Sequence, residues 1–230
     1  MDLNRVTRVA GRVPLRTCLI STADKRGLEE LIRGLWERIP DLSIISTGGT
    51  YRAISGLAQS VGRERQLLSI SSYTGQPEMQ GGLVKTLDYR MYLGLLSESF
   101  NAEHHADLER SGATPIDLTV CNFYPFERVA ATTGASLEDL RTHIDIGGPS
   151  MLRASAKNFL RVACVHSPDD YPELLAELDR QQGATSLAWR AERAAAAFRY
   201  TAHYEAAIAG ALGSHIRSAD LTKVYEEAGQ

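Results

Sequence analysis

The sequence predicts an α/β fold in which a mainly parallel sheet is covered by helices and followed by a helical C-terminal extension. Short apolar segments typical of buried strands alternate with segments whose apolar residues recur at helical spacing. This alternation favours parallel strands joined by helices. Glycine turns separate the segments, and after residue 171 the chain becomes rich in alanine, a strong helix former.

The first half of the chain predicts two units, each a strand followed by a helix. Residues 15–20 form a short apolar strand candidate, and apolar residues then recur at helical spacing over residues 28–39. A second strand is expected at residues 42–46 and ends in the glycine turn at residues 47–50, with a short helix after it.

The second half continues the alternation. Buried strands are expected at residues 116–121 and 162–165, with helical stretches around residues 137–142 and 151–159. Residues 172–212 are predicted to be helical and to pack on the sheet domain or on another subunit. The simplest partition has one domain over residues 15–212, with an α/β core to about residue 170 and a helical extension over residues 171–212. An N-terminal extension (residues 1–14) and a polar tail (residues 213–230) flank it.

Charge and cysteine content exclude several classes of protein. A formal net charge of -3 does not favour nucleic acid or an anionic membrane as the main partner. No apolar run approaches the roughly 20 residues that span a bilayer, and the basic start lacks the apolar stretch of a secretion signal, so a cytoplasmic protein is expected. Cys18, Cys121 and Cys164 are widely spaced and odd in number, which predicts reduced core thiols and no zinc site.

Lysine is scarce, so each lysine is a candidate functional residue. Only Lys25, Lys85, Lys157 and Lys223 occur among the 25 basic residues. Where arginine fills most exposed basic positions, a lysine points to a need for a compact, titratable ammonium.

Two segments are expected to form a phosphate cradle, defined here as Lys25 and residues 47–50. Both follow strands, and ligands favour the carboxyl edge of a parallel sheet. Gly48 and Gly49 let consecutive N–H groups turn toward an anion. The alternative is a plain turn that caps a helix.

Three further segments carry polar groups in glycine-rich or strand-end contexts. Residues 81–88 hold Lys85 in a glycine-led loop, which could equally be a solvated surface loop. Residues 145–149 lead into a helix through a proline, and Arg153 and Lys157 lie one turn apart further along it; the alternative is a helix cap followed by two solvated bases. Residues 122–126 would place Asn122 and Tyr124 at the sheet edge, or form a turn with a buried aromatic.

Other polar residues are interpreted as solvent-exposed. His104 and His105 lie in a polar helical segment without a metal-ligand partner at suitable spacing. Arg190, Arg193 and Arg199 are expected on the charged outer face of the alanine-rich helix.

Five segments, in this order, resemble the cyclohydrolase domain of the bifunctional purine-biosynthesis enzyme AICAR formyltransferase/IMP cyclohydrolase. They are STADKRGL, STGGTYRAI, TGQPEMQGGLVKTLD, CNFYPF and IDIGGPSMLRASAKN, and AAFRYTAHYEAAI resembles the last helix of that domain. The similarity runs from about Cys18 to Leu212 and implies a methylglyoxal-synthase-like fold. The usual second domain has no room in 230 residues, so a separate protein is expected to supply formyl transfer.

The resemblance implies an IMP cyclohydrolase, an enzyme of the cyclic amidine hydrolase class. Its reaction closes the ring of formylated aminoimidazole carboxamide ribonucleotide (FAICAR) to give IMP, with loss of water. Because the carboxamide nitrogen is a poor nucleophile, catalysis must orient it, remove a proton and stabilise an oxyanion. These tasks require no metal or other cofactor. The family also implies a homodimer.

The resemblance assigns residues to two parts of the site. The phosphate and ribose would contact Ser21, Lys25, Thr47, Gly48, Gly49, Thr50 and Thr86. Catalytic and base-contacting positions fall on Lys85, Asn122, Tyr124, Asp145 and Lys157, with backbone contacts from Gly147 and Gly148. Lys157 would stabilise the oxyanion or leaving hydroxyl, Asp145 would orient or deprotonate the carboxamide, and Lys85 and Tyr124 would transfer protons.

The chain departs from the family pattern near residue 85. Leu83 replaces an arginine and Asp88-Tyr89 replaces histidine-proline, so a phosphate-binding cation is missing. A second histidine is also missing near Tyr92. Arg90 is a candidate replacement for the lost guanidinium. In the last helix Ala197 replaces a lysine and Glu205 replaces an aspartate.

The rival interpretation is a non-catalytic nucleotide-sensing module, because the same fold also serves as an allosteric domain. A sensor needs only the phosphate cradle, whereas catalysis also needs Lys85, Tyr124, Asp145 and Lys157. All four are present, which favours the enzyme. Methylglyoxal synthase itself is disfavoured because the motifs match the cyclohydrolase along the chain.

Overall fold

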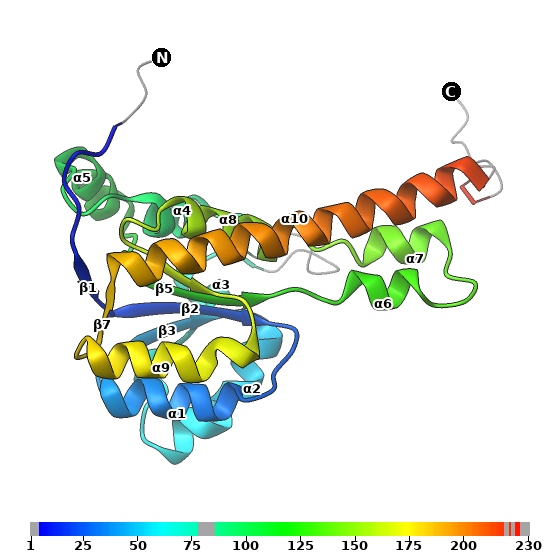
Figure 1. Cartoon of the computed structure of the whole chain (residues 1–230). Helices are drawn as coiled ribbons and strands as arrows, with labels where there is room; N and C mark the ends of the chain where they lie inside the picture. Colours follow the sequence, from blue (N-terminus) through cyan, green and yellow to red (C-terminus); the bar gives the residue numbers. More distant parts are fainter. Residues whose placement is uncertain (1–4, 78–85, 219–220, 222–223, 226–230) are drawn as a thin grey trace.

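A five-stranded parallel sheet forms the centre of the molecule. The computed structural model describes residues 5–77, 86–218, 221, 224 and 225 (Figure 1). In spatial order the strands are β4 (Leu67–Ser69), β3 (Ser43–Ser46), β2 (Thr17–Thr22), β5 (Leu118–Asn122) and β6 (Ala163–Val165). Each neighbouring pair is parallel, so the predicted parallel α/β sheet is confirmed.

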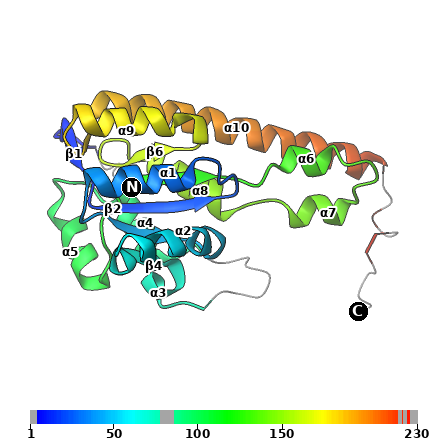
Figure 2. The ribbon, with the colours of Figure 1, turned by 90° about the horizontal axis from the view of Figure 1, so that it is seen from below.

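Helices cover both faces of this sheet (Figures 1 and 2). One face packs against α1 (Leu28–Arg38), α2 (Gly48–Ser60) and α9 (Tyr171–Arg180). The other packs against α3 (Ile70–Thr74), α4 (Tyr89–Leu96), α8 (Gly147–Lys157) and α10 (Leu187–Ser218). The remaining helical segments are η1 (Glu64–Gln66), α5 (Ala102–Ser111), α6 (Phe126–Ala130), α7 (Leu137–Thr142) and η3 (Pro168–Asp170).

Alternation along the strands creates two hydrophobic cores. In β2, Cys18 and Ile20 face the core beneath α1, whereas Leu19 faces the core beneath α8 and α10. Successive side chains of a strand point to opposite faces, so a strand with helices on both sides is apolar throughout. The three cysteines are free and buried, as predicted.

A separate two-stranded sheet was not predicted. β1 (Arg12–Pro14) pairs antiparallel with β7 (Ala184–Ser186). Residues 172–212 are therefore not helical throughout, and the predicted N-terminal extension contains a strand. α10 also continues to Ser218, past the expected start of the tail at residue 213. No helix in the described part of the chain is long and apolar enough to span a membrane.

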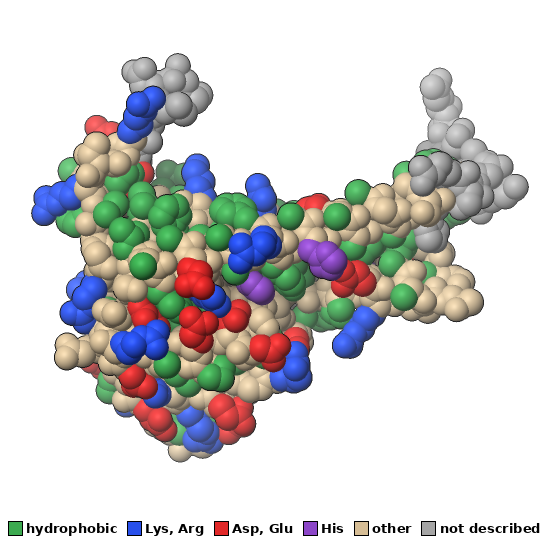
Figure 3. All heavy atoms as spheres, viewed as in Figure 1, with side chains coloured by type: hydrophobic (Ala, Val, Ile, Leu, Met, Phe, Trp, Pro, Cys, Tyr) green, Lys and Arg blue, Asp and Glu red, His purple; other side chains and the backbone are tan. Residues whose placement is uncertain are grey.

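The distal half of α10 projects beyond the sheet and packs against α6 and α7 (Figures 1 and 2). Phe126 and Leu140 from these short helices share a core with Tyr204 and Ile208 of α10. In Figure 3 charged side chains gather over α1 and α9, whereas hydrophobic and uncharged side chains cover much of the outward face of α10. The α6–α7 segment thus packs against α10 and leads, along the chain, into the loop before α8.

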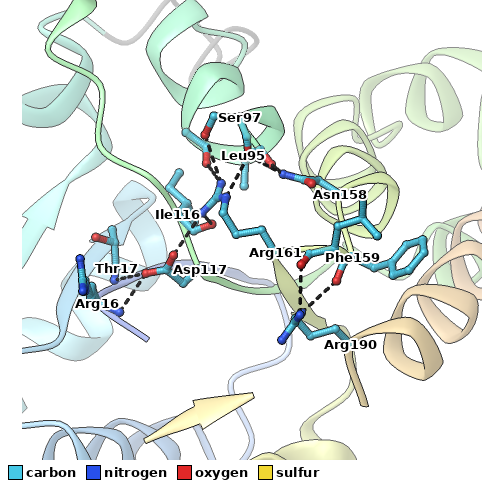
Figure 4. A network of polar contacts seen from close by, with 12 residues as sticks. Arg16, Thr17, Leu95, Ser97, Ile116, Asp117, Asn158, Phe159, Arg161 and Arg190 are labelled. Carbon is cyan, nitrogen blue, oxygen red and sulfur yellow. Dashed lines mark hydrogen bonds and ion pairs between the residues drawn. The ribbon is translucent and has the colours of Figure 1, made fainter. Parts of the chain in front are cut away.

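Arg190 is a buried residue, which corrects the prediction of a charged outer helix face. Its side chain is fully buried and donates hydrogen bonds to the carbonyl oxygens of Ala10, Phe159, Leu160 and Thr185. Figure 4 shows the bond to Phe159. Burial lowers the pKa of Arg190 to about 10. Arg193 is also largely buried and pairs with Asp170, so only Arg199 fits the predicted exposed position.

A second buried network joins the amino ends of the strands (Figure 4). The guanidinium of Arg161 contacts Asp117 at 3.1 Å and donates to the carbonyl oxygens of Gly94, Ser97 and Ile116. The other oxygen of Asp117 accepts the N–H groups of residues 16 and 17, which lead into β2. Buried polar groups of this kind stabilise the fold only when they are fully hydrogen-bonded, and this network lies at the edge opposite the cavity described next.

Candidate active site at the carboxyl edge of the sheet

A polar cavity of about 540 Å³ lies at the carboxyl ends of β2, β3 and β5. This volume is in the usual range for small-molecule sites. The predicted site residues that line the cavity are Ser21, Lys25, Thr47, Gly48, Gly49, Thr50, Thr86, Asn122, Tyr124, Asp145, Gly147 and Gly148. The fold therefore brings together segments that lie more than a hundred residues apart in the chain.

The loop after β2 is shaped by hydrogen bonds from within the site. The ammonium of Lys25 donates to the carbonyl oxygen of Thr22 at 3.1 Å. The side-chain oxygen of Asn122 accepts the N–H groups of Ala23 and Asp24, both at 2.8 Å, and its amide donates back to the Asp24 carbonyl. Asn122 therefore holds this loop through three hydrogen bonds, and its contact with a base stays a prediction, because it also lines the cavity.

The start of α2 forms the second wall of the cavity. Gly48 and Gly49 form the first turn of this helix, so the predicted turn at residues 47–50 is its N-terminus. N–H groups in a first turn have no acceptor within the helix and suit an anion. The hydroxyl of Thr50 accepts from the Thr22 N–H and donates to the Thr22 carbonyl, which ties α2 to β2.

The start of α8 forms the third wall and carries Asp145. One oxygen of this carboxylate accepts the Gly148 N–H at 3.0 Å. Burial nevertheless raises the pKa of Asp145, although the hydrogen bonds from Gly148 and Gly147 act in the opposite direction. A carboxylate whose pKa is raised toward neutrality is better suited to accept a proton. Asp145 is thus the candidate base of the cavity.

Tyr124 and Thr86 complete the site from two other segments. Tyr124 follows β5, lines the cavity and has 65% of its surface exposed, while the preceding Phe123 is buried. The buried hydroxyl of Thr86 lies against Gly147, where an added Cβ would come within 2.4 Å of it. The loop of residues 122–126 therefore combines the predicted buried aromatic with an exposed phenol.

Replacing Gly148 with alanine is expected to lower turnover by at least about tenfold, because small displacements of reacting groups are costly. The new Cβ would lie 2.6 Å from an oxygen of Asp145 and 2.9 Å from the Phe123 ring. The matched control is Gly56→Ala in α2, where a Cβ meets nothing within 4 Å. Turnover and melting temperature of both variants test this. Wild-type turnover in Gly148→Ala would show that the carboxylate has room to move.

Lys157 is not brought to the cavity by the chain's own fold. It is the exposed last residue of α8, whereas Gly147 at the first position lines the cavity. Ten residues of helix separate the two by about 15 Å along the axis. Asp145 lies just before α8 and Lys157 at its far end, so the catalytic role of Lys157 remains a prediction.

The altered segment around residue 85 is partly described. Lys85 and Leu83 lie outside the described residues. Asp88 accepts the N–H groups of Arg90 and Met91 and caps α4, which gives this departure from the family pattern a structural role. Arg90 donates to the Gly112 carbonyl at 2.6 Å and lies over the Tyr73 ring. The proposed replacement of the missing guanidinium by Arg90 therefore does not occur in this structure.

Sequence reasoning missed the contribution of the α7–α8 connection. Thr142, His143, Ile144 and Ile146 also line the cavity. Their position next to Asp145 was the available signal, but these residues carry no glycine or motif that marks them. Among the described residues no cluster of three or more histidine, cysteine or acidic side chains could hold a metal ion.

Comparisons with known proteins agree with this arrangement. The family described as AICARFT/IMPCHase bienzyme matches residues 155–229. The bifunctional purine biosynthesis protein PurH of Sorangium cellulosum (strain So ce56) is 44% identical over 214 residues, which are 93% of this chain and 39% of that protein. PurH of Nostoc punctiforme is 42% identical over 197 residues, or 86% of this chain and 37% of that protein. The crystal structure of ForH matches with a TM-score of 0.69 at 30% identity and covers 86% of this chain and 98% of that one.

The fold and the cavity define the general class of protein to which the chain belongs. The chain is an α/β protein of the methylglyoxal-synthase-like fold, with a polar cavity at the carboxyl edge of its parallel sheet. Within this class it belongs to the AICARFT/IMPCHase family and matches the IMP cyclohydrolase part of PurH. The chain spans 39% of the length of the Sorangium relative, so the activities of the whole relatives are not carried over directly.

Proposed function

We propose that this chain is an IMP cyclohydrolase that closes the ring of FAICAR to give IMP and water in purine biosynthesis. The single observation that carries the proposal is the convergence of Asp145, Tyr124 and two helix N-termini on one cavity. A nucleotide-sensing module would need the anion-binding part alone. The second half of the cavity supplies a carboxylate with a raised pKa and a phenol, which are the groups that ring closure requires.

The phosphate is proposed to bind at the start of α2. The N–H groups of Gly48 and Gly49 belong to the first turn of a helix of 13 residues, whose dipole favours an anion there. The Lys25 ammonium lines the same part of the cavity and adds a full positive charge. Thr47 and Ser21, whose hydroxyls lie 3.0 Å apart, add further donors.

Lys25→Ala is expected to weaken binding of IMP by about tenfold, since a hydrogen bond to a charged group contributes about 1.5–3 kcal/mol and the exposed position of Lys25 favours the lower end of this range. Calorimetric titration of IMP measures the effect. The matched control is Arg26→Ala, because Arg26 pairs with Asp24 on the same loop and does not line the cavity. Equal affinity of Lys25→Ala and wild type, with lost turnover, would contradict the phosphate assignment.

The chemistry is proposed to begin at the carboxamide nitrogen. Asp145 orients this group or takes its proton, and Tyr124 with Lys85 moves protons to and from the former formyl oxygen. That oxygen leaves as water after the new C–N bond has formed. The N–H groups of Gly147 and Gly148 at the start of α8 donate to the Asp145 carboxylate and hold it in place for this step. No cofactor enters these steps.

Lys157 is proposed to act at the cavity of a second copy of the chain in a homodimer, since its own cavity is about 15 Å away along α8. Lys157→Ala is then expected to lose about two to three orders of magnitude in turnover. Unfolded Lys157→Ala and Asp145→Asn chains can be mixed in equal amounts and refolded together. About half of the dimers are then mixed, and each mixed dimer has one intact site, so about a quarter of all sites should be active. Lys157→Ala with wild-type turnover would remove the residue from the mechanism.

The direct test is to add FAICAR to the purified protein and to follow the absorbance change as IMP forms. Turnover that is abolished in Asp145→Asn supports the proposal. Tight IMP binding without turnover would instead identify a nucleotide sensor. A separate source of formyl transfer remains a prediction that this assay does not address, because FAICAR is supplied directly.

A further inference from the structure

Two tyrosines of α10 contact the backbone beside the two proposed acid–base residues. The hydroxyl of Tyr204 accepts the backbone N–H of Asp145 at 2.8 Å. The hydroxyl of Tyr200 accepts the N–H of Phe123 at 3.2 Å, immediately before Tyr124. Neither tyrosine is among the described residues that line the cavity. Both therefore act from behind the site.

The tyrosine rings are held in place by an aromatic cluster. The Tyr200 ring stacks between Phe123, at 4.7 Å between centroids, and His166, at 4.6 Å. The Tyr204 ring meets the edge of Phe123 at 5.0 Å and is itself buried. Such ring pairs stabilise defined relative orientations. The two hydroxyls are thus fixed relative to the sheet.

Helix geometry links the two contacts. Tyr200 and Tyr204 are four residues apart, so they lie on one face of α10 about 6 Å apart along its axis. The segments they contact come from different parts of the chain, one after β5 and one before α8. A single helical turn therefore sets the spacing between the backbone next to Tyr124 and the backbone of Asp145.

We propose that Tyr200 and Tyr204 are positioning residues that fix Tyr124 and Asp145 relative to each other within the cavity. This inference rests on the proposed function, which gives Tyr124 and Asp145 their catalytic roles. The hydroxyls are needed in addition to the rings, because each hydroxyl is the hydrogen-bond acceptor of one backbone N–H. Removal of one hydroxyl releases one of the two segments.

Three phenylalanine substitutions test the proposal. Tyr204→Phe and Tyr200→Phe each keep the ring and remove the hydroxyl, and each is expected to lower kcat by about ten- to a hundredfold while KM changes little, since misplacement of reacting groups mainly affects the transition state. The matched control is Tyr73→Phe. The Tyr73 hydroxyl accepts the N–H of Thr114 at 2.9 Å, at the opposite edge of the sheet, and its loss should leave kcat unchanged.

Titration of Asp145 by carbon NMR separates the two tyrosines and does not depend on activity. Tyr204→Phe should release the Asp145 segment, expose the carboxyl to water and lower its pKa toward the ordinary value, because burial is what raises it. Tyr200→Phe and Tyr73→Phe should leave that pKa unchanged. The titratable groups around Asp145 are Tyr200 and Tyr204 on α10, Cys121 on β5, and Lys25, Tyr124 and His143 at the cavity.

The outcomes distinguish this inference from the proposed function. If the wild-type chain does not convert FAICAR, the proposed function fails, and a lowered pKa of Asp145 in Tyr204→Phe alone still supports the positioning role. Wild-type kcat and an unchanged pKa of Asp145 in Tyr204→Phe would overturn it. An equal loss of kcat in Tyr73→Phe would also overturn it, because general destabilisation would then explain the effect.

Discussion

Asp145→Asn is expected to lower turnover of FAICAR by about two to four orders of magnitude, the usual contribution of a general base. Asparagine keeps the size of the side chain, and its amide oxygen can still accept the Gly148 N–H that Asp145 accepts at 3.0 Å. The substitution therefore removes the basic oxygen and preserves the start of α8. Affinity for IMP should change little, because the phosphate is proposed to bind at the start of α2 and not at Asp145.

The pH dependence of wild-type turnover provides a second test of Asp145. Burial raises the pKa of this carboxyl above its ordinary value. A base must be ionised, so turnover should be full above this raised pKa and fall as the pH decreases through it, at a higher pH than an exposed aspartate would give. The control is Asp139→Asn on α7, an exposed residue of a capping box. Asp145→Asn with substantial turnover, or a profile without an acid limb, would contradict the assignment.

Arg190→Leu is expected to reduce the free energy of unfolding by about 3 kcal/mol or more. The substitution removes the donors for four carbonyl oxygens, and an unsatisfied buried polar group costs about 1–3 kcal/mol. Leucine fills part of the volume of the arginine side chain and removes the free-energy cost of burying a charge. The loss of stability therefore reports mainly on the missing hydrogen bonds and less on a cavity. Arg190 is fully buried, and its partners lie in three separate segments of the chain.

Urea unfolding measures this effect, with Arg199→Leu as the control on the same helix. Arg199 is exposed, and exposed substitutions usually change stability by less than about 0.5 kcal/mol. Equal stability of the two variants would show that water or a backbone shift replaces the donors of Arg190. An intermediate in the unfolding curve would show that α10 separates from the sheet before the rest unfolds.

Four strands of the sheet were predictable because each is buried on both faces, whereas the edge strand β4, in which Leu68 is exposed, was not predicted. β3 and β6 lie within one residue of the expected bounds, and β2 and β5 each begin two residues later than expected. Most of the cavity was also predictable, because glycines and hydroxyl residues at strand ends mark the carboxyl edge of a parallel sheet. The helix start at Gly48 follows from the same rule, whereas Asp145 was marked by the proline that leads into α8 and by the family resemblance.

Residues whose roles depend on distant partners were not predictable. The pattern around Arg190 resembles an exposed helix face, and only the fold brings the carbonyl oxygens of Ala10 and Phe159 to it. The role of Asn122 in holding the loop after β2 was not predicted, since it depends on the backbone of Ala23 and Asp24 about a hundred residues earlier. Lys157 matches a motif in sequence, yet helix length separates it from the cavity.

The position of β2 in the middle of the sheet has a consequence for synthesis of the protein on the ribosome. Cys18 in β2 is paired with Ile44 in β3 and with Leu118 in β5, so one neighbour is translated soon after it and the other about a hundred residues later. The proposed anion-binding wall depends on both neighbours, because Asn122 at the end of β5 holds the loop that carries Lys25. The hydrogen bond from the Asp145 N–H to Tyr204 can form only after α10 has emerged, so a ribosome-stalled chain that ends before α10 is expected to bind phosphate compounds without turning over FAICAR.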